Sequence, residues 1–320
     1  MQSLRLLLMT QWLLLFLPIC TASYILKDDY GNDERFFDKF DFFTEADPTR
    51  GYVSYVNRST AKLTSLISAS NGSVYLGVDN KNPAWGPGRR SVRLTSHQSY
   101  NHGLIILDLA HMPGTVCGTW PAFWMIGTVP PTAGEIDIIE GINEGPLNQV
   151  TLHTNQDGCI VKNSGFSGSL GRQNCYIYST GPAGAGGCGI VDPYPESYGG
   201  IFNAVGGGVY ATEWTSDVIR VWRFPRSKIP GNMQSGSPDP STWGTPVASF
   251  SGSCNIDAQF NNLHLVFDIT FCGDWAGGAW ASSRLCAPKA PTCFEYVRNN
   301  PRAFEESYWR VNSLKVYQRT

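Results

Sequence analysis

Charged side chains are scarce in this sequence of 320 residues. Asp, Glu, Lys and Arg make up 16% of it, against about 25% in a typical soluble protein. The 24 Lys and Arg are balanced by 26 Asp and Glu, so the chain lacks the basic surface of a nucleic-acid-binding protein. Aromatic residues, in contrast, reach 12%. A surface with little charge and many aromatic rings suits a neutral, polyhydroxylated ligand, because apolar C–H faces pack against such rings.

The sequence also lacks internal repeats, long charge runs and Pro/Ser-rich linkers. We therefore expect residues 24–320 to form a single domain. The glycine-rich stretches at 181–189 and 199–208 are short, and we expect them to be loops between strands. A hydrophobic C-terminal tail is missing too, which argues against a lipid anchor at that end.

Residues 1–23 have the features of a signal peptide. Arg5 precedes an apolar run that Thr10 and Gln11 interrupt, so the run is too short and too polar to span a bilayer. Small residues follow, and cleavage is expected near Ala22 or Ser23. An uncleaved membrane anchor is the alternative. The pattern predicts a secreted, extracellular protein.

No two cysteines have the Cys-x-x-Cys spacing that is typical of a zinc site. Eight cysteines remain after the leader, and an even number in an oxidising compartment predicts up to four disulfides. Their pairing is not readable, since eight cysteines allow 105 combinations. Sequons for N-glycosylation begin at Asn57 and Asn71 and fit a secreted surface.

Short runs of β-branched and aromatic residues alternate with glycine and proline turns along most of the chain. Five of these runs are predicted to be strands: residues 51–56, 73–78, 103–109, 218–224 and 264–269. Many short strands of this kind favour an all-β sandwich or jelly roll. One late helix is expected, because Thr292 and Glu295 have capping-box spacing and Pro301 ends the segment.

Three acidic residues lie close together in residues 134–141, Gly-Glu-Ile-Asp-Ile-Ile-Glu-Gly. Side chains alternate faces along a strand, so Glu135 and Asp137 share one face. Glu140 is five positions after Glu135 and would point to the opposite face of a regular strand. A one-residue bulge between Asp137 and Glu140 would return it to the acidic face, and bulges are common beside active sites. The intervening isoleucines are then expected to pack in the core.

Such a group of carboxyls suits glycoside hydrolysis. One carboxylate attacks the anomeric carbon or activates water, and another protonates the leaving oxygen. The spacing alone leaves open whether the reaction retains or inverts the anomeric configuration. The same three acids would also fit a site for a hard cation or a solvated acidic strand. No Ser-His-Asp arrangement or phosphate-binding loop stands out, so serine-hydrolase and nucleotide chemistry are not expected.

The acidic segment resembles the Glu-x-Asp-x-x-Glu signature of glycoside hydrolase family 16, and the wider chain resembles its fungal laminarinase-like endo-1,3(4)-β-glucanases. Further segments carry the likeness: residues 36–43, 47–53, 117–124, 149–154, 211–215, 271–277 and 308–313. Together they cover nearly all of the chain after the leader. The resemblance implies a concanavalin-like β-jelly roll of two antiparallel sheets, with minor short helices and a substrate cleft on the concave sheet.

The same resemblance implies a retaining mechanism and assigns the catalytic roles. Glu135 would be the nucleophile, Glu140 the general acid/base, and Asp137 the residue that assists the nucleophile.

Two tryptophans and a histidine are candidates for substrate binding. Trp124 is predicted to be a sugar platform, whereas Trp120 is assigned to the core. Trp275 stands before Ala-Gly-Gly, and such a loop is a poor place to bury an indole, so we assign it to a subsite. His153 follows the acidic segment on an expected neighbouring strand. Its ring is expected to face the cleft and to bond the substrate or Glu140.

Arg93 and Glu213 are weaker candidates for substrate binding. Each lies in a segment that matches the family, but each could instead form a surface salt bridge.

The sequence therefore predicts a secreted, monomeric endo-hydrolase of β-1,3- or mixed β-1,3/1,4-glucan, with no nucleic-acid or membrane partner. Carboxyl chemistry requires no cofactor, and no metal ligand is assigned. A cell-wall transglycosylase of the same fold is one alternative. A non-catalytic glucan-binding protein is another, although this chain keeps both glutamates. Linkage preference is expected to depend on the loops at 127–134 and 165–189.

Overall fold

The computed structural model describes residues 23–127, 134–179 and 186–320. The predicted signal peptide, up to residue 22, lies outside the described residues. So do residues 128–133 and 180–185 of the two predicted cleft loops. Among the described residues, no helix is both long and apolar enough to cross a bilayer.

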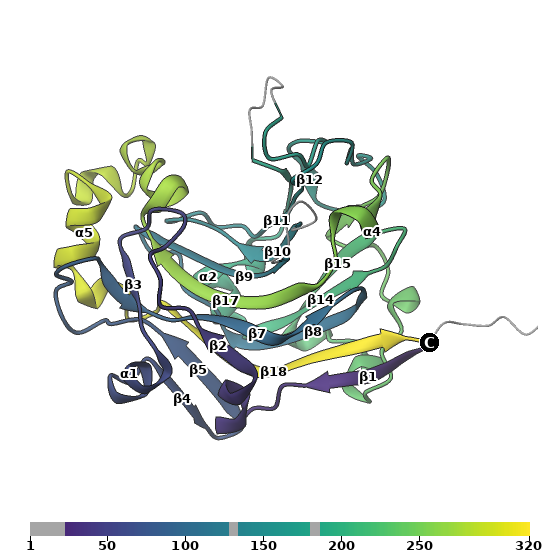
Figure 1. Cartoon of the computed structure of the whole chain (residues 1–320), viewed down its shortest axis with the longest axis horizontal. Helices are drawn as coiled ribbons and strands as arrows, with labels where there is room; N and C mark the ends of the chain where they lie inside the picture. Colours follow the sequence, from purple (N-terminus) through teal and green to yellow (C-terminus); the bar gives the residue numbers. More distant parts are fainter. Residues whose placement is uncertain (1–22, 128–133, 180–185) are drawn as a thin grey trace, which may run out of the picture.

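Two antiparallel eight-stranded sheets, stacked on each other, form the body of the molecule (Figure 1). The first sheet has the order β16 (Ala248–Phe250), β15 (Ile219–Pro225), β14 (Gly208–Trp214), β8 (Gly103–His111), β18 (Tyr308–Arg319), β5 (Ser73–Gly77) and β4 (Ile67–Ser70), and β1 (Tyr24–Asp29) also pairs with β18. The second sheet has the order β12 (Ser169–Leu170), β13 (Cys188–Val191), β11 (Gln149–His153), β10 (Glu135–Glu140), β9 (Thr119–Gly127), β17 (Leu263–Phe271), β7 (Arg93–Tyr100) and β2 (Phe40–Phe42).

The remaining elements are short. A small parallel pair joins β3 (Val53–Tyr55) and β6 (Arg89–Ser91). The α-helices are α1 (Arg58–Leu63), α2 (Gly199–Ala204), α3 (Gly231–Gln234), α4 (Ile256–Gln259) and α5 (Cys293–Asn299). The 3₁₀ segments are η1 (Glu34–Lys39), η2 (Pro195–Ser197), η3 (Arg226–Lys228), η4 (Pro240–Thr242), η6 (Trp280–Ser282), η7 (Ala287–Lys289) and η8 (Pro301–Phe304), and η5 (Gly273–Gly277) is a single π-helical turn. The prediction of an all-β jelly roll with minor helices is confirmed.

The facing sides of the two sheets share one apolar core. The second sheet contributes alternate residues such as Phe123, Ile136, Leu152 and Phe267, and the first contributes residues such as Leu107 and Val316. All of these side chains are 1% exposed or less. Because side chains alternate along a strand, the other face of the second sheet is left free to carry polar groups. In Figure 1 this sheet is curved, with its concave side toward the top.

All five predicted strands are present, although the run at 51–56 shortens to β3. The predicted helix is α5: the Thr292 side chain accepts a hydrogen bond from the Glu295 N–H, as a capping residue does, and Pro301 begins η8. The eight cysteines form four disulfides, which confirms their predicted use: Cys117–Cys286, Cys159–Cys254, Cys175–Cys188 and Cys272–Cys293.

Candidate active site

The predicted bulge is present in β10. Asp137 pairs with Trp124 of β9, and Ile139 pairs with the next residue, Phe123, so Ile138 is the extra residue. Ile138 and Ile139 consequently both point into the core, where they are 1% and 0% exposed. The alternation then resumes one position late, which returns Glu140 to the face that carries Glu135 and Asp137.

Asn148 holds the bulge in place. Its side-chain amide donates to the Ile138 carbonyl (3.0 Å), and its side-chain oxygen accepts from the Glu140 N–H (2.9 Å). The ladder between β10 and β11 reaches only as far as Asp137 and Thr151. The Asn148 amide therefore supplies the donor and acceptor that a neighbouring strand would otherwise provide. Asn148 is fully buried, and sequence reasoning missed it.

His153 lies on the strand beside the acidic one, as predicted, and is paired with Glu135 across the ladder. Its Nε2 is 3.1 Å from Asp137 Oδ2 and 3.8 Å from Glu135 Oε1. Of the two partners expected for His153, the substrate and Glu140, the second was wrong, because cross-strand pairing sets His153 opposite Glu135, at the other end of β10 from Glu140. The ring thus contacts the two acids that were assigned to nucleophilic attack and its assistance.

Burial and repulsion between carboxylates raise the pKa values of the three carboxyls. Burial, and after it the charge of Asp137, raise the pKa of Glu135 to about 8, and the same two causes raise the pKa of Glu140 to about 8. Burial also raises the pKa of Asp137 well above its usual range. His153 and Arg93 act in the opposite direction on Glu135. The site can therefore hold an ionised and a protonated carboxyl side by side.

Trp120 lies in the cleft, and its assignment to the core was wrong. Its indole N–H donates to Glu140 Oε1 (2.8 Å), and its ring meets the Trp275 ring edge-on at 5.6 Å between centroids. The pairing of β9 with β17 is regular throughout, so positions 120 and 124 lie on the same face of β9. The alternation that placed Trp124 in the cleft therefore also places Trp120 there.

Two hollows meet at the glutamates and together form the cleft on the concave face. The larger, of about 590 Å³, is lined by His153 and Trp275, and the smaller, of about 280 Å³, by Arg93 and Trp124. Four residues line both hollows: Thr49, Trp120, Glu135 and Glu140. The two carboxyls thus stand at the middle of a cleft that continues on either side of them.

Each hollow carries one of the predicted tryptophans. Trp275, in η5, is half-buried. Trp124 is 9% exposed, and the Arg93 guanidinium lies 4.9 Å from its ring centre. Arg93 therefore lies in the cleft and contacts the indole, and its role in substrate binding stays a prediction.

Glu213 is not in the cleft, and its assignment to substrate binding was wrong. It lies on β14 of the first sheet, accepts a hydrogen bond from the Tyr24 hydroxyl (2.8 Å) and pairs with Arg220 (3.0 Å). Its neighbours Val209 and Ala211, at alternate positions of β14, pack in a small apolar cluster apart from the main core. Glu213 therefore points away from the core, on the side of the first sheet that is remote from the cleft. The likeness of its segment to the family does not tell on which face of the sheet a residue lies.

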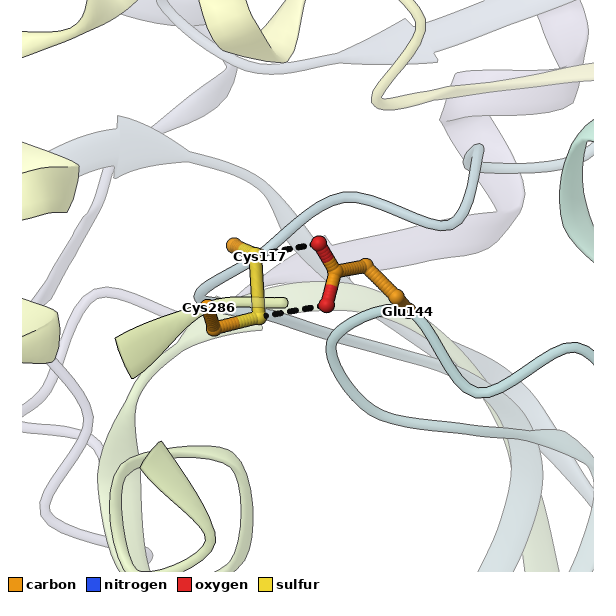
Figure 2. Close-up of side chains that lie close together, drawn as sticks. All are labelled: Cys117, Glu144 and Cys286. Atoms are coloured by element: carbon orange, nitrogen blue, oxygen red, sulfur yellow. Dashed lines mark hydrogen bonds between the residues drawn. A yellow bond between two sulfur atoms is a disulfide. The ribbon is translucent and has the colours of Figure 1, made fainter. Parts of the chain in front are cut away.

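Among the residues that the structure describes, two groups of side chains have the composition of a metal site. Glu135, Asp137 and His153 form one, within the cleft. The other consists of Cys117, Cys286 and Glu144, whose carboxylate oxygens lie 2.8 and 2.9 Å from the two sulfurs (Figure 2). The sulfurs are joined in a disulfide, and a disulfide offers no thiolate to a metal ion. This second group is therefore a close contact between a carboxylate and a disulfide.

The chain is similar to known proteins over nearly its whole described length. A family model for XgeA-like catalytic GH16 domains matches residues 40–317. An endo-1,3(4)-beta-glucanase of Arthroderma benhamiae is 48% identical over 93% of this chain. The chain spans 65% of the length of that relative, and 41% of the length of a probable endo-1,3(4)-beta-glucanase from Aspergillus niger.

Solved structures with the same fold include two enzymes with different reactions. An elongating GH family 16 beta-1,3-glucosyltransferase is 44% identical, with a TM-score of 0.86, over 92% of this chain and all of that one. Laminarinase 16A from Phanerochaete chrysosporium, with 6-O-glucosyl-laminaritriose in its donor and acceptor sites, is 39% identical with a TM-score of 0.86. The match extends over 93% of this chain and over the whole of the laminarinase chain.

Proposed function

The chain belongs to glycoside hydrolase family 16, and we propose that it is an endo-acting hydrolase of β-1,3- or mixed β-1,3/1,4-glucans that retains the anomeric configuration. One observation carries this proposal: Glu135 and Glu140 line both hollows of the cleft. A polymer lying across both hollows presents an internal bond to the carboxyls. This arrangement supports cleavage within the chain rather than from its end.

In the proposed reaction, the Glu135 carboxylate attacks the anomeric carbon while Glu140 protonates the oxygen of the departing chain. Glu140 then takes a proton from water, which attacks the glycosyl-enzyme and releases Glu135. The raised pKa of Glu140 supports its role as the acid. The charge of Arg93, which lowers the pKa of Glu135 and so favours its ionised form, supports the role of Glu135 as the nucleophile. Asp137 would assist by sharing charge and protons with Glu135, and His153 by holding both carboxyls in place.

Sugar rings are proposed to pack on one indole in each hollow, Trp275 on one side of the carboxyls and Trp124 on the other. The C–H faces of a pyranose are apolar and suit an aromatic ring, while its hydroxyls remain free to bond polar groups. Arg93 and His153 supply N–H donors within reach of such a ligand. A neutral glucan is thereby favoured over a charged polysaccharide.

We further propose that residues 24–320 form a single catalytic domain, monomeric and secreted after removal of residues 1–23. Four disulfides support an oxidising compartment. Both sequon asparagines are exposed: Asn57 caps α1, and Asn71 lies in the turn between β4 and β5. Glycans at these positions would not obstruct the strands that pair on either side of the turn.

Transfer of the cleaved chain to another sugar is the second candidate reaction. It is favoured by the 44% identity to a β-1,3-glucosyltransferase of the same fold. The two reactions share the glycosyl-enzyme and differ in whether water or a sugar hydroxyl reacts with it.

A substrate panel tests the proposal. The secreted protein is incubated with laminarin, barley glucan, lichenan, cellulose and agarose, and reducing ends and product lengths are followed. We expect new reducing ends from the first three, with products of intermediate length early in the reaction. The proposal would be overturned if no reducing ends were released from any of the β-glucans. In a parallel incubation with a laminari-oligosaccharide, products longer than that oligosaccharide, formed without a net rise in reducing ends, would establish transfer as the main reaction.

A further inference from the structure

Trp85 is the one tryptophan in the described residues that is largely exposed, with 71% of its surface accessible. It lies in the loop of residues 79–88, between β5 and β6, and lines a separate hollow of about 350 Å³. Of the described residues that line this hollow, none also lines the cleft. A single exposed apolar side chain is common on protein surfaces, whereas a larger exposed apolar patch rimmed by polar residues marks a binding surface.

The loop that carries Trp85 is firmly held. Arg89 is completely buried, and its guanidinium donates to the carbonyls of Asp79 and Asn82 in the loop and of Val297 in α5. The Tyr52 hydroxyl donates to the Ala84 carbonyl next to the indole (2.8 Å). Burying a guanidinium is costly unless its donors are satisfied, and here the carbonyls that satisfy it fix the loop. The exposure of Trp85 is thus built into the fold.

Gly88 contributes to this close packing. Its φ is +147°, and an added Cβ would lie 2.2 Å from the Tyr52 backbone. Only glycine adopts such a backbone readily and allows two chains to approach this closely.

Helix α5 extends the exposed aromatic surface. Phe294 and Arg298 are four positions apart and share a face of the helix. Phe294 is 44% exposed and stacks on Tyr52, with 5.0 Å between ring centres. The Arg298 guanidinium lies 5.8 Å from the Tyr52 ring and 5.8 Å from the Trp85 ring. The four side chains form a continuous row with an exposed ring at each end.

Polar groups of both signs border this row. The hollow beside Trp85 is lined by Asp79, Asn82 and Arg90. An exposed ring next to acceptors and donors of opposite charge suits a ligand that is neutral, ring-shaped and rich in hydroxyls. The disulfide Cys272–Cys293 ties α5 to the segment that begins η5 and carries the cleft residue Trp275. The row is therefore rigidly connected to the wall of the cleft.

We propose that Trp85, Phe294 and the hollow beside Trp85 form a second binding surface for β-glucan, separate from the cleft, that holds the enzyme on its polymer. The proposal rests on the proposed function, since it takes the same polymer as ligand. Binding at a second point raises the local concentration of polymer at the cleft, which matters for an insoluble glucan and not for a short oligosaccharide.

Adsorption to insoluble particles of linear β-1,3-glucan tests this surface. The Glu135→Gln variant, which should leave the polymer intact, is compared with the double variant Glu135→Gln/Trp85→Ala by depletion from solution. We expect Glu135→Gln/Trp85→Ala to adsorb about tenfold more weakly than Glu135→Gln. The single variant Trp85→Ala should keep its kcat/KM on a soluble laminari-oligosaccharide, because Trp85 lines no part of the cleft. Trp85→Tyr should restore most of the adsorption.

Leu63→Ala, also made in the Glu135→Gln variant, is the matched control, since Leu63 is 86% exposed and lies on α1, outside the row. This double variant should adsorb as strongly as Glu135→Gln alone. Unchanged adsorption of the Trp85→Ala double variant would overturn the second surface. The second surface would also be overturned if Trp85→Ala lowered oligosaccharide cleavage as much as it lowered adsorption. The same holds if Trp85 contributed to tighter binding of an anionic polysaccharide than of β-1,3-glucan. If the unmutated protein cleaves no β-glucan, the proposed function fails. If it cleaves them but adsorbs independently of Trp85, only the second surface fails.

Discussion

At the scale of single residues, Asn148 makes contacts that link stability to catalysis. Replacing it with alanine leaves the Ile138 carbonyl and the Glu140 N–H buried without their partner. An unsatisfied buried group costs about 1–3 kcal/mol. A small displacement of a catalytic group can lower the rate about 100-fold. For Asn148→Ala we therefore expect both a lower free energy of unfolding in urea and a kcat reduced by about that factor.

Asn203→Ala is the control for this prediction. The Asn203 side chain, on α2, also bonds a backbone N–H and a carbonyl, both of Met112, but just after the end of β8 in the first sheet. It should lose stability and keep its kcat. Equal kcat values for the two variants would contradict a positioning role for Asn148.

The raised pKa of Glu135 also predicts how the free energy of unfolding depends on pH. An ordinary glutamate has a pKa of 4.5, whereas that of Glu135 is raised to about 8, mainly by burial. Between these values the folded protein retains a proton that the unfolded chain releases, so the free energy of unfolding falls as pH rises through this window. Glu135→Gln removes the titrating group. The melting temperature of this variant should decline less between about pH 5 and about pH 8 than that of the unmutated protein.

Parallel melting curves for Glu135→Gln and the unmutated protein would show that Glu135 titrates as an ordinary carboxyl in the fold.

Sequence reasoning at this scale succeeded where a local rule applied. It identified the three acids, because alternation and a bulge involve only neighbours in one strand. The same rule would have found Trp120, four positions from Trp124 in an unbroken strand. Asn148 and the Asp137 partner of His153 depend on contacts between strands, which a single sequence does not contain. Glu213 was assigned from a likeness that is silent about which side of a sheet a residue occupies.

At the scale of elements, the bulge in β10 sets the spacing of the glutamates. Deleting Ile138 removes the extra residue and leaves Glu135, Asp137 and Glu140 on alternate positions, still on one face. Deleting both Ile138 and Ile139 would turn Glu140 toward the core. We expect the single deletion to retain measurable activity, within about 100-fold of the unmutated protein. The double deletion should have none.

Both deletions remove buried isoleucine, which costs about 2–5 kcal/mol per side chain in packing. Circular dichroism should therefore accompany the assays, so that activity is compared between folded proteins. A double deletion that folds and is as active as the single one would contradict the role given to the bulge.

The strands that sequence reasoning found are short runs rich in β-branched and aromatic residues between turn residues. It missed β18, the longest strand of the first sheet, whose pairing with β8 shifts register between Arg310 and Val311 and again between Val311 and Ser313. These irregularities interrupt the alternation of buried and exposed residues on which prediction depends. The two-residue strand β12 has too few side chains to show any pattern.

At the scale of the whole molecule, the disulfides constrain the chain to different degrees. Cys159–Cys254 joins residues 95 positions apart, whereas Cys175–Cys188 joins residues 13 apart. The longer loop has more conformational entropy to lose in the unfolded state. Replacing both cysteines of Cys159–Cys254 with serine should therefore lower the free energy of unfolding by about 2 kcal/mol more than the same change at Cys175–Cys188. Urea titration measures both, and equal losses would argue against this entropic origin.

These pairings show what remained beyond the sequence. The number of disulfides followed from composition and compartment, but each pair closes a loop whose ends meet only in the finished fold. The separation of the cleft into two hollows is likewise a property of the curved sheet, to which β7, β9, β10, β11 and β17 all contribute. A few residues of the sequence were enough to predict the chemistry of the site, but not the shape and length of the cleft.

The division of roles between Glu135 and Glu140 is most directly tested by azide, which can take the place of a missing carboxylate or of water. Glu135→Ala and Glu140→Ala are each given azide and a β-linked laminari-oligosaccharide with an activated leaving group, and the anomer of the product is determined by proton NMR. Without Glu135, azide attacks the side opposite the leaving group, so an α-azide is expected. Without Glu140, azide attacks the glycosyl-enzyme formed by Glu135, so a β-azide is expected. The opposite pair of products, or the same anomer from both variants, would contradict the assignment.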